Sequence, residues 1–153
     1  MIQLNPEPPP DHYIQLGRVM SACSMLELKI GMIGWAAKNG KPWTEQWDEV
    51  AGQNGGAKKL AKSQLPHMDD ALAAEVRELL TKAESVLQER HKYAHAVFIL
   101  DPTQPAEDQW ILRSPRMIES RPLTEHEGNK LVVTANRLSK QATVLSKRAA
   151  HQP

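Results

Sequence analysis

Three side chains that can act together on a phosphate lie close to one another in the sequence: Arg90, His91 and His95. Arginine keeps its positive charge and binds phosphate through several N–H groups, whereas histidine takes up and releases protons near neutral pH. The residues before them recur at steps of four and three, which keeps them on one face of a predicted helix. That apolar face consists of Leu72, Val76, Leu79, Ala83 and Val86. The next step reaches Arg90, so a guanidinium occupies a position at which the pattern predicts a core residue.

A guanidinium on an apolar face needs a partner, because burying an unpaired charge is costly. Arg90 has three alternatives: it extends into solvent, it pairs with an acid inside the protein, or it lines a cleft that binds an anion. Glu27, next to an apolar face of an earlier predicted helix, is one candidate partner, and Glu89 is another. The simplest interpretation of Glu27 is nevertheless that its side chain lies in solvent. Likewise, His91 and His95 can simply be half-buried residues at the end of a bundle.

Arg90 and His95 do not share one face of a straight helix. Five residues of α-helix turn the side chain by about 140°, so the two side chains diverge. They converge on one phosphate if the helix ends between them, which the apolar, β-branched residues from position 96 onward favour. They also converge if two copies of the chain face each other across a two-fold axis.

Other chemistries have less support in the sequence. His91 and His95 are four residues apart and could bind zinc, but Lys92 stands where a zinc protease has its glutamate, and no third ligand lies near. The single cysteine, Cys23, excludes an internal disulfide and falls on an apolar face, where a small buried side chain is expected. No phosphate-binding glycine loop and no nucleophile-elbow motif is present, so we expect neither a metal nor another cofactor.

The composition is typical of one globular domain. The chain has 153 residues, of which 41% are hydrophobic and 24% charged, and its net charge is +1. Residues 113–153 carry eight basic side chains and three acidic ones. Such a basic segment can follow a phosphate backbone, but the simpler interpretation is a helix face exposed to solvent. The sequence has no pattern of a secretory signal, and no apolar run near the ~20 residues that span a bilayer. We therefore expect a cytoplasmic protein without membrane contact.

The chain is predicted to fold mainly into α-helices, as an antiparallel bundle of four to five helices with a small β-hairpin inserted before the last helix. We expect residues 1–11 to form an extended, proline-rich arm and residues 12–150 to form a single helical-bundle domain. The predicted elements are helices at about 12–38, 44–50, 57–62 and 69–93, strands near 96–100 and 110–112, and a helix at 124–149. The expected start signals are Asp11, Asp69 or Asp70, and a capping box from Thr124 to Glu127.

The first predicted helix is apolar on two roughly opposite faces. One face includes Leu16, Val19, Cys23, Leu26, Ile30 and Ile33, and the other includes Met25, Leu28, Met32 and Trp35. Such a helix is covered on both sides, so it lies either in the centre of the bundle or against another chain. The second alternative is the reason to expect a homodimer.

The segment Arg90-His91-Lys92-Tyr93-Ala94-His95 resembles the R-x4-6-H motif of HEPN domains. In that family the motif lies late in a long helix of an antiparallel bundle. The order of elements here is similar, with a long first helix containing Leu26-Glu27-Leu28, then the motif helix, then a long closing helix. The resemblance covers about residues 12–149 in pattern, and six residues carry its specific part. His91 departs from the family, in which Asn or Asp more often follows the arginine, and this leaves the assignment of the base open.

The resemblance implies a metal-independent endoribonuclease, of toxin or defence type, that cleaves RNA through attack of the ribose 2′-hydroxyl. His95 would move the proton, Arg90 would neutralise the phosphate and His91 would orient one of them, with Glu27 in support. The residues expected to bind RNA are Lys92, Tyr93, Arg113 and Arg116. The alternative is a non-catalytic HEPN-like helical-bundle dimer that binds RNA, a nucleotide or a partner protein such as an antitoxin.

Overall fold

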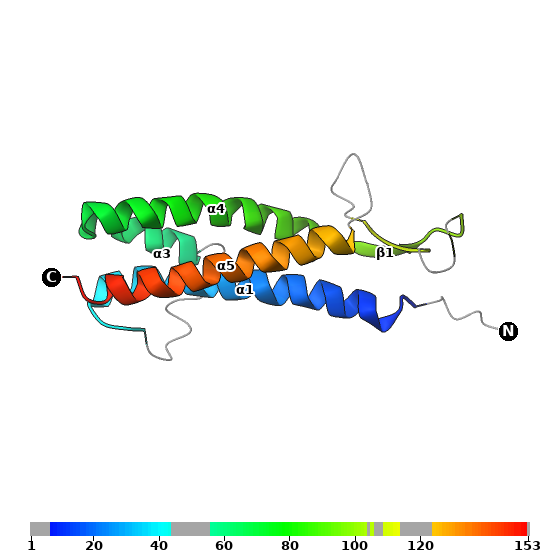
Figure 1. The fold of residues 1–153 in the computed structure, drawn as a ribbon, viewed down its shortest axis with the longest axis horizontal. Coiled ribbons are helices and arrows are strands. Elements are labelled where there is room, and N and C mark those ends of the chain that lie inside the picture. Colours follow the sequence, from blue (N-terminus) through cyan, green and yellow to red (C-terminus); the bar gives the residue numbers. More distant parts are fainter. Residues whose placement is uncertain (1–6, 44–55, 104, 106–108, 114–123, 153) are drawn as a thin grey trace.

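The computed structural model describes residues 7–43, 56–103, 105, 109–113 and 124–152. Its elements are the helices α1 (Pro10–Asn39), α3 (Gly56–Gln64), α4 (Asp70–Ala94) and α5 (Glu125–Ala149), a short 3-10 helix η1 (Leu65–His67), and the strands β1 (Val97–Leu100) and β2 (Trp110–Arg113). Figure 1 shows the three long helices along one another and the hairpin beyond the end of α4. The predicted mainly helical fold, with a small hairpin before its last helix, is confirmed. The helix expected at 44–50 lies outside the described residues.

Local hydrogen bonds set the starts of α4 and α5. The side chain of Asp69 accepts a hydrogen bond of 2.8 Å from the backbone N–H of Leu72, which caps α4. The predicted capping box opens α5, because the Thr124 hydroxyl accepts from the N–H of Glu127 and the Glu127 carboxylate accepts from the N–H of Thr124. Both starts therefore agree with the sequence signals.

The start of α1 differs from the prediction. Proline fixes the backbone angle φ at the value that the first residue of a helix needs. It has no backbone N–H, but at this position an N–H would have no partner within the helix. α1 accordingly begins at Pro10, after the N-cap residue Pro9, which has no side chain that could accept a capping bond. The prediction that Asp11 caps this helix is wrong, since Asp11 lies within its first turn.

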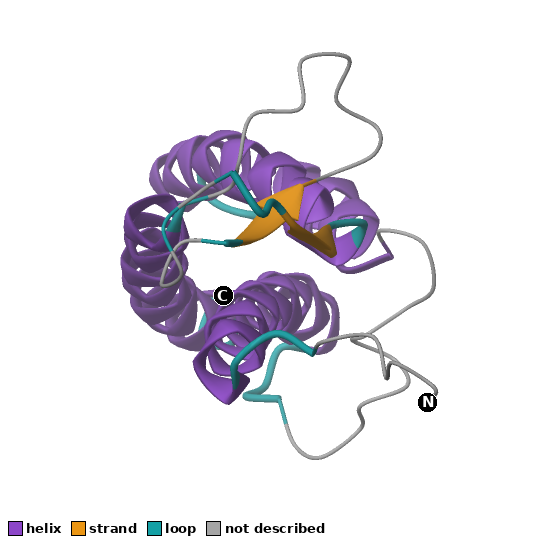
Figure 2. Ribbon diagram, turned by 90° about the vertical axis from the view of Figure 1, so that its right-hand side faces the viewer, coloured by secondary structure: helices purple, strands orange, loops and turns teal. Residues whose placement is uncertain are grey.

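The strands form a two-stranded antiparallel hairpin, which Figure 2 shows from the end of the bundle at which it lies. Phe98 faces Leu112 across the strands, so the two side chains share one face of the ribbon. Leu112 packs against the bundle core, and the ring of Phe98 meets that of Tyr13 on α1, with 5.1 Å between centroids. Val97 and Ile99, on the other face, are exposed. Because an isolated two-stranded ribbon is marginally stable, these contacts with the bundle hold the hairpin in place.

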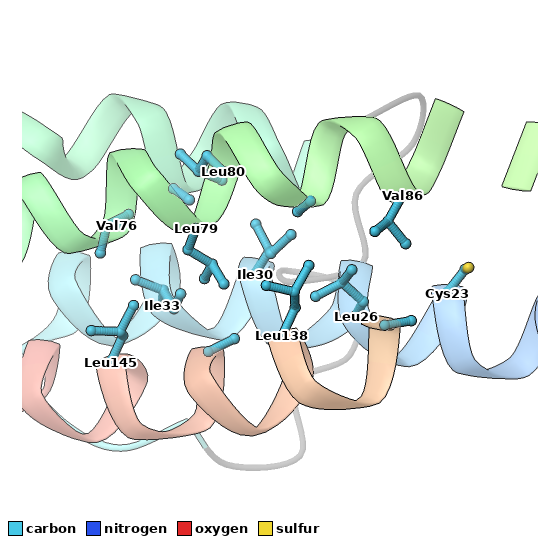
Figure 3. Close-up of a cluster of buried hydrophobic side chains, with 14 of the residues drawn as sticks. Cys23, Leu26, Ile30, Ile33, Val76, Leu79, Leu80, Val86, Leu138 and Leu145 are labelled. Carbon is cyan, nitrogen blue, oxygen red and sulfur yellow. The ribbon is translucent and has the colours of Figure 1, made fainter. Parts of the chain in front are cut away.

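α1 is the central helix, since it packs against α5, α3 and α4. Its first apolar face is largely buried, and Figure 3 shows Leu26, Ile30 and Ile33 among side chains of α4 and α5. The second face is covered only in part, because Trp35 is 2% exposed whereas Met25 is 45% exposed. α1 thus lies in the centre of the bundle and also presents part of its second face to solvent.

By length and composition alone, α1 could also cross a membrane. An 18-residue window of this helix has a mean hydropathy of 1.2, and 56% of the window is buried inside the bundle. A core helix that other helices cover passes the same test, so the observation is weak evidence for a membrane span.

Gly34 lies where α3 approaches α1 most tightly. A Cβ atom at this position would lie 2.6 Å from the backbone nitrogen of Ala61 and 2.7 Å from the carbonyl carbon of Leu60, both in α3. These backbone atoms cannot give way unless α3 itself shifts. We therefore expect Gly34→Ala to lower the free energy of unfolding by about 1–3 kcal/mol, the usual cost of overpacking.

Gly17→Ala is the matched control, because it lies in the same helix and a Cβ there would meet no atom of the described residues within 4 Å. Alanine forms helices better than glycine, so this variant should gain about 0.5–1 kcal/mol. Denaturant unfolding of both variants measures the difference. Equal stability of the two would contradict the close approach of α3 to α1.

Candidate active site at the end of α4

The last turn of α4 holds the predicted site. The helix ends at Ala94, and His95 is its C-cap residue, with φ −110° and ψ 8°. The backbone N–H groups of His95 and Ala96 both donate to the carbonyl of Tyr93, after which β1 begins at Val97. The change from helix-forming to β-branched and aromatic residues thus ends the helix directly at His95.

Arg90 forms an ion pair with Glu27 of α1, which confirms the candidate partner named from the sequence. Nη1 lies 2.8 Å from Oε2 and Nη2 lies 3.3 Å from Oε1, so the contact is bidentate. The side chains of Arg90 and Glu27 are 20% and 35% exposed, and the buried Nε of Arg90 has no hydrogen-bond partner among the described residues. The guanidinium is therefore fixed in direction, while part of its donor capacity is unused.

Cys23 lies beside this ion pair and is fully buried. Burial raises the pKa of its thiol to about 11 from the usual 9.0, while the charge of Arg90 lowers the pKa and that of Glu27 raises it. The thiol is therefore neutral at physiological pH. A neutral, inaccessible thiol is a poor nucleophile, so Cys23 is the small buried side chain that its position predicted.

His91 and His95 form a second pair on the same turn. Their ring centroids are 4.7 Å apart and the rings meet edge-on, at an interplanar angle of 78°. His91 is exposed and His95 is half-buried, so solvent reaches this pair. Two imidazoles in contact at a protein surface can move protons near neutral pH. Among the described residues, no group of three His, Cys, Asp or Glu side chains could hold a metal ion.

Of the expected RNA-binding residues, the structure describes the side chains of Lys92 and Tyr93. Lys92 is half-buried and pairs with Glu89 of the same helix, at 2.6 and 2.8 Å from the two carboxylate oxygens. Tyr93 is 4% exposed and belongs to the core, so only a small part of its side chain reaches solvent. Arg113 is the last residue of β2, and its backbone pairs with Val97. Arg116 lies outside the described residues.

A groove between α4 and α5 is a feature that the sequence did not reveal. Its volume is about 340 Å³, and it is lined by Ser85, Val86, Glu89, Tyr93, Glu127, Lys130, Leu131 and Thr134. The only sequence signal is the spacing of these residues at three and four along each helix. That spacing places them on one face but does not say which residues of the neighbouring helix lie opposite.

Comparison with models of protein families, with curated proteins and with solved structures yields no match. The interpretation of this site therefore depends on its own geometry.

The partly buried pair of Arg90 and Glu27 should stabilise the fold more than an exposed pair does. Removing one partner leaves a half-buried charge, so we expect Glu27→Ala to cost about 1–3 kcal/mol, and a double-mutant cycle with Arg90→Met to give a coupling of about 1–2 kcal/mol. The control is Arg148 with Glu75, in which Nη1 alone contacts both carboxylate oxygens, at 2.8 and 2.9 Å, and in which both side chains are well exposed. Its coupling should stay below about 1 kcal/mol. Equal couplings would contradict the role of burial.

The buried thiol predicts a loss of stability at alkaline pH. The unfolded chain releases the Cys23 proton near pH 9, whereas the folded chain keeps it up to about pH 11. The free energy of unfolding should therefore fall between these two values, by roughly 1–2 kcal/mol, and Cys23→Ala should lack this part of the decline. Denaturant unfolding of both proteins across that range measures it. A constant difference in stability between parent and variant would contradict the prediction.

Proposed function

We propose that this protein is a HEPN-like metal-independent endoribonuclease, of toxin or defence type, whose site is the end of α4. One observation carries this proposal: a guanidinium held by a carboxylate and a contacting pair of solvent-reached imidazoles lie within six residues of one another at the end of α4. These groups supply the two requirements for breaking RNA by its own 2′-hydroxyl, which are charge neutralisation and proton transfer.

Arg90 is the proposed phosphate-binding group. Glu27 holds it through Nη1 and Nη2, and each of these two nitrogens has a second N–H group that can bind a phosphate. A fixed guanidinium needs little reorganisation when charge builds on the phosphate in the transition state. Glu27 is therefore a positioning residue in this proposal.

His95 is the proposed proton-transfer group, and His91 supports it. His95 takes the proton of the 2′-hydroxyl, whose oxygen attacks phosphorus, and the bond from phosphorus to the 5′-oxygen breaks as that oxygen takes a proton from solvent water, to which His95 later returns its own. The products carry a 2′,3′-cyclic phosphate and a 5′-hydroxyl. His91, whose ring lies edge-on to that of His95, orients the base in this scheme.

A homodimer is part of the proposal. Because α-helix turns Arg90 and His95 apart, a second copy across a two-fold axis would let each chain complete the phosphate site of the other. Support comes from the partly exposed second face of α1, where Met25 is 45% exposed. RNA as the substrate would place the protein in the cytoplasm.

The ion pair also favours a second candidate function. Glu27 offsets the charge of Arg90, so an incoming phosphate competes with a bidentate carboxylate. A site with this balance suits a non-catalytic helical-bundle dimer that binds RNA, a nucleotide or a partner protein such as an antitoxin.

Cleavage of labelled RNA by the purified protein in the presence of EDTA tests the proposal. We expect products with 2′,3′-cyclic phosphate ends, and a loss of about 10²-fold or more in rate for His95→Ala and for Arg90→Ala. His67→Ala is the control for a histidine away from α4, since His67 ends η1 and is exposed, and it should cut at the parent rate.

Growth of cells that express the protein adds a second readout. Growth arrest by the parent that Arg90→Ala relieves would agree with the nuclease. RNA binding without cleavage, unchanged in His95→Ala, would favour the binding module instead. A His95→Ala protein that cuts RNA as fast as the parent would remove the catalytic account.

A further inference from the structure

The groove between α4 and α5 lies next to the candidate site. α4 runs toward the hairpin and α5 runs away from it, so the end of one helix meets the start of the other (Figure 1). Tyr93 lines the groove, and its carbonyl accepts the backbone N–H of His95. A molecule in the groove would therefore lie within a nucleotide's length of the imidazoles.

The lining of the groove is apolar at its floor and polar at its rims. Val86, Tyr93 and Leu131 are buried and form the floor. Ser85 of α4 and Thr134 of α5 add hydroxyl groups. At about 340 Å³ the groove is at the small end of ligand sites, which suits one flat ring system with a polar edge.

Lys130 is a cation at the rim that has no acidic partner among the described residues. Its side chain is exposed, and its ammonium makes no ion pair with any of the described residues, whereas Lys58, Lys82 and Lys92 each have a carboxylate partner. An unpaired ammonium beside an apolar floor suits an anionic group attached to a ring, as in a nucleotide.

Glu89 is the acceptor at the opposite rim. Both of its oxygens contact Lys92, but the side chain is 49% exposed, so this pair is weak and the carboxylate keeps further acceptor positions. Glu127, the other carboxylate of the groove, is already engaged in capping α5. Glu89 is thus the carboxylate that can accept hydrogen bonds from N–H groups at the edge of a ring.

We infer that this groove binds a guanine nucleotide, with the base on the floor, its Watson–Crick edge on Glu89 and its phosphate on Lys130. Guanine presents two neighbouring N–H donors on that edge, which match the two oxygens of a carboxylate. Adenine and cytosine present one donor beside an acceptor, and uracil presents one donor between two acceptors. A carboxylate therefore favours guanine over the other three bases.

For its role in cleavage, this inference rests on the proposed function: the guanine is the RNA residue beside the scissile phosphate. The groove then determines where the RNA is cut, while Arg90, His91 and His95 carry out the reaction. Guanine recognition itself requires only the groove, so a free guanine nucleotide is the second source of the same chemistry.

Calorimetric titration with the four ribonucleoside 5′-monophosphates tests the binding. We expect GMP to bind at least tenfold more tightly than AMP, CMP or UMP, and Glu89→Gln to remove that preference. Lys130→Ala should weaken all four alike. The control is Glu78→Gln, which removes a carboxylate that also pairs with a lysine of α4 but does not line the groove, and it should bind as the parent does. Equal affinity of the parent for the four nucleotides would overturn the inference.

An RNA of defined sequence with single guanines separates the two sources. Cleavage beside guanine in the parent, and loss of that base preference in Glu89→Gln, would support the role in cutting. GMP binding without any cleavage would support a free nucleotide as the ligand and would count against the nuclease. Cleavage without base preference, together with no GMP binding, would overturn the groove's role and leave the nuclease intact.

Discussion

The fold depends on the need to cover one long helix on more than one side. α1 is apolar on two faces, so α5, α3 and α4 all pack against it, and the core forms where they meet. Glu27 lies beside the most buried face, at the point where α4 ends. The carboxylate can be half-buried there because Arg90 meets it, and the guanidinium can interrupt the apolar face of α4 for the same reason. The position of the candidate site thus follows from the packing of the central helix.

The same interaction explains the chemical character of the site. A bidentate carboxylate fixes the guanidinium and also offsets its charge, so the pair favours a rigid site with modest affinity for anions. The buried thiol of Cys23 on one side keeps this region apolar. On the other side, the helix ends and two imidazoles reach solvent. The proposed division of labour, with binding on the inner side and proton transfer on the outer side, follows from these two environments.

Much of the fold could be predicted because the signals were local. The periodic apolar residues of α4 and α5 and the caps at Asp69 and Thr124 depend only on nearby residues, and they gave helix boundaries within one residue. Glu27 could be named because it lies next to an apolar face. The spacing of four could place His91 beside His95, but the groove beside Tyr93 could not be foreseen, since it depends on how α4 aligns with α5. The start of α1 could not be predicted from Asp11, because Pro10 can itself begin a helix and places Asp11 in the first turn.

The close contact at Gly34 has a consequence for how the protein unfolds. α3 has nine residues, which is too few for a stable isolated helix, so its helical structure depends on the surface of α1 that receives Ala57 and Ala61. The three long helices share most of the core without it. α3 is therefore the helix best able to detach and refold while the rest stays intact, and its amide hydrogens should exchange with solvent before those of α1, α4 and α5. The absence of a side chain at Gly34 thus allows α3 to pack closely on α1, and this packing keeps the short basic helix ordered.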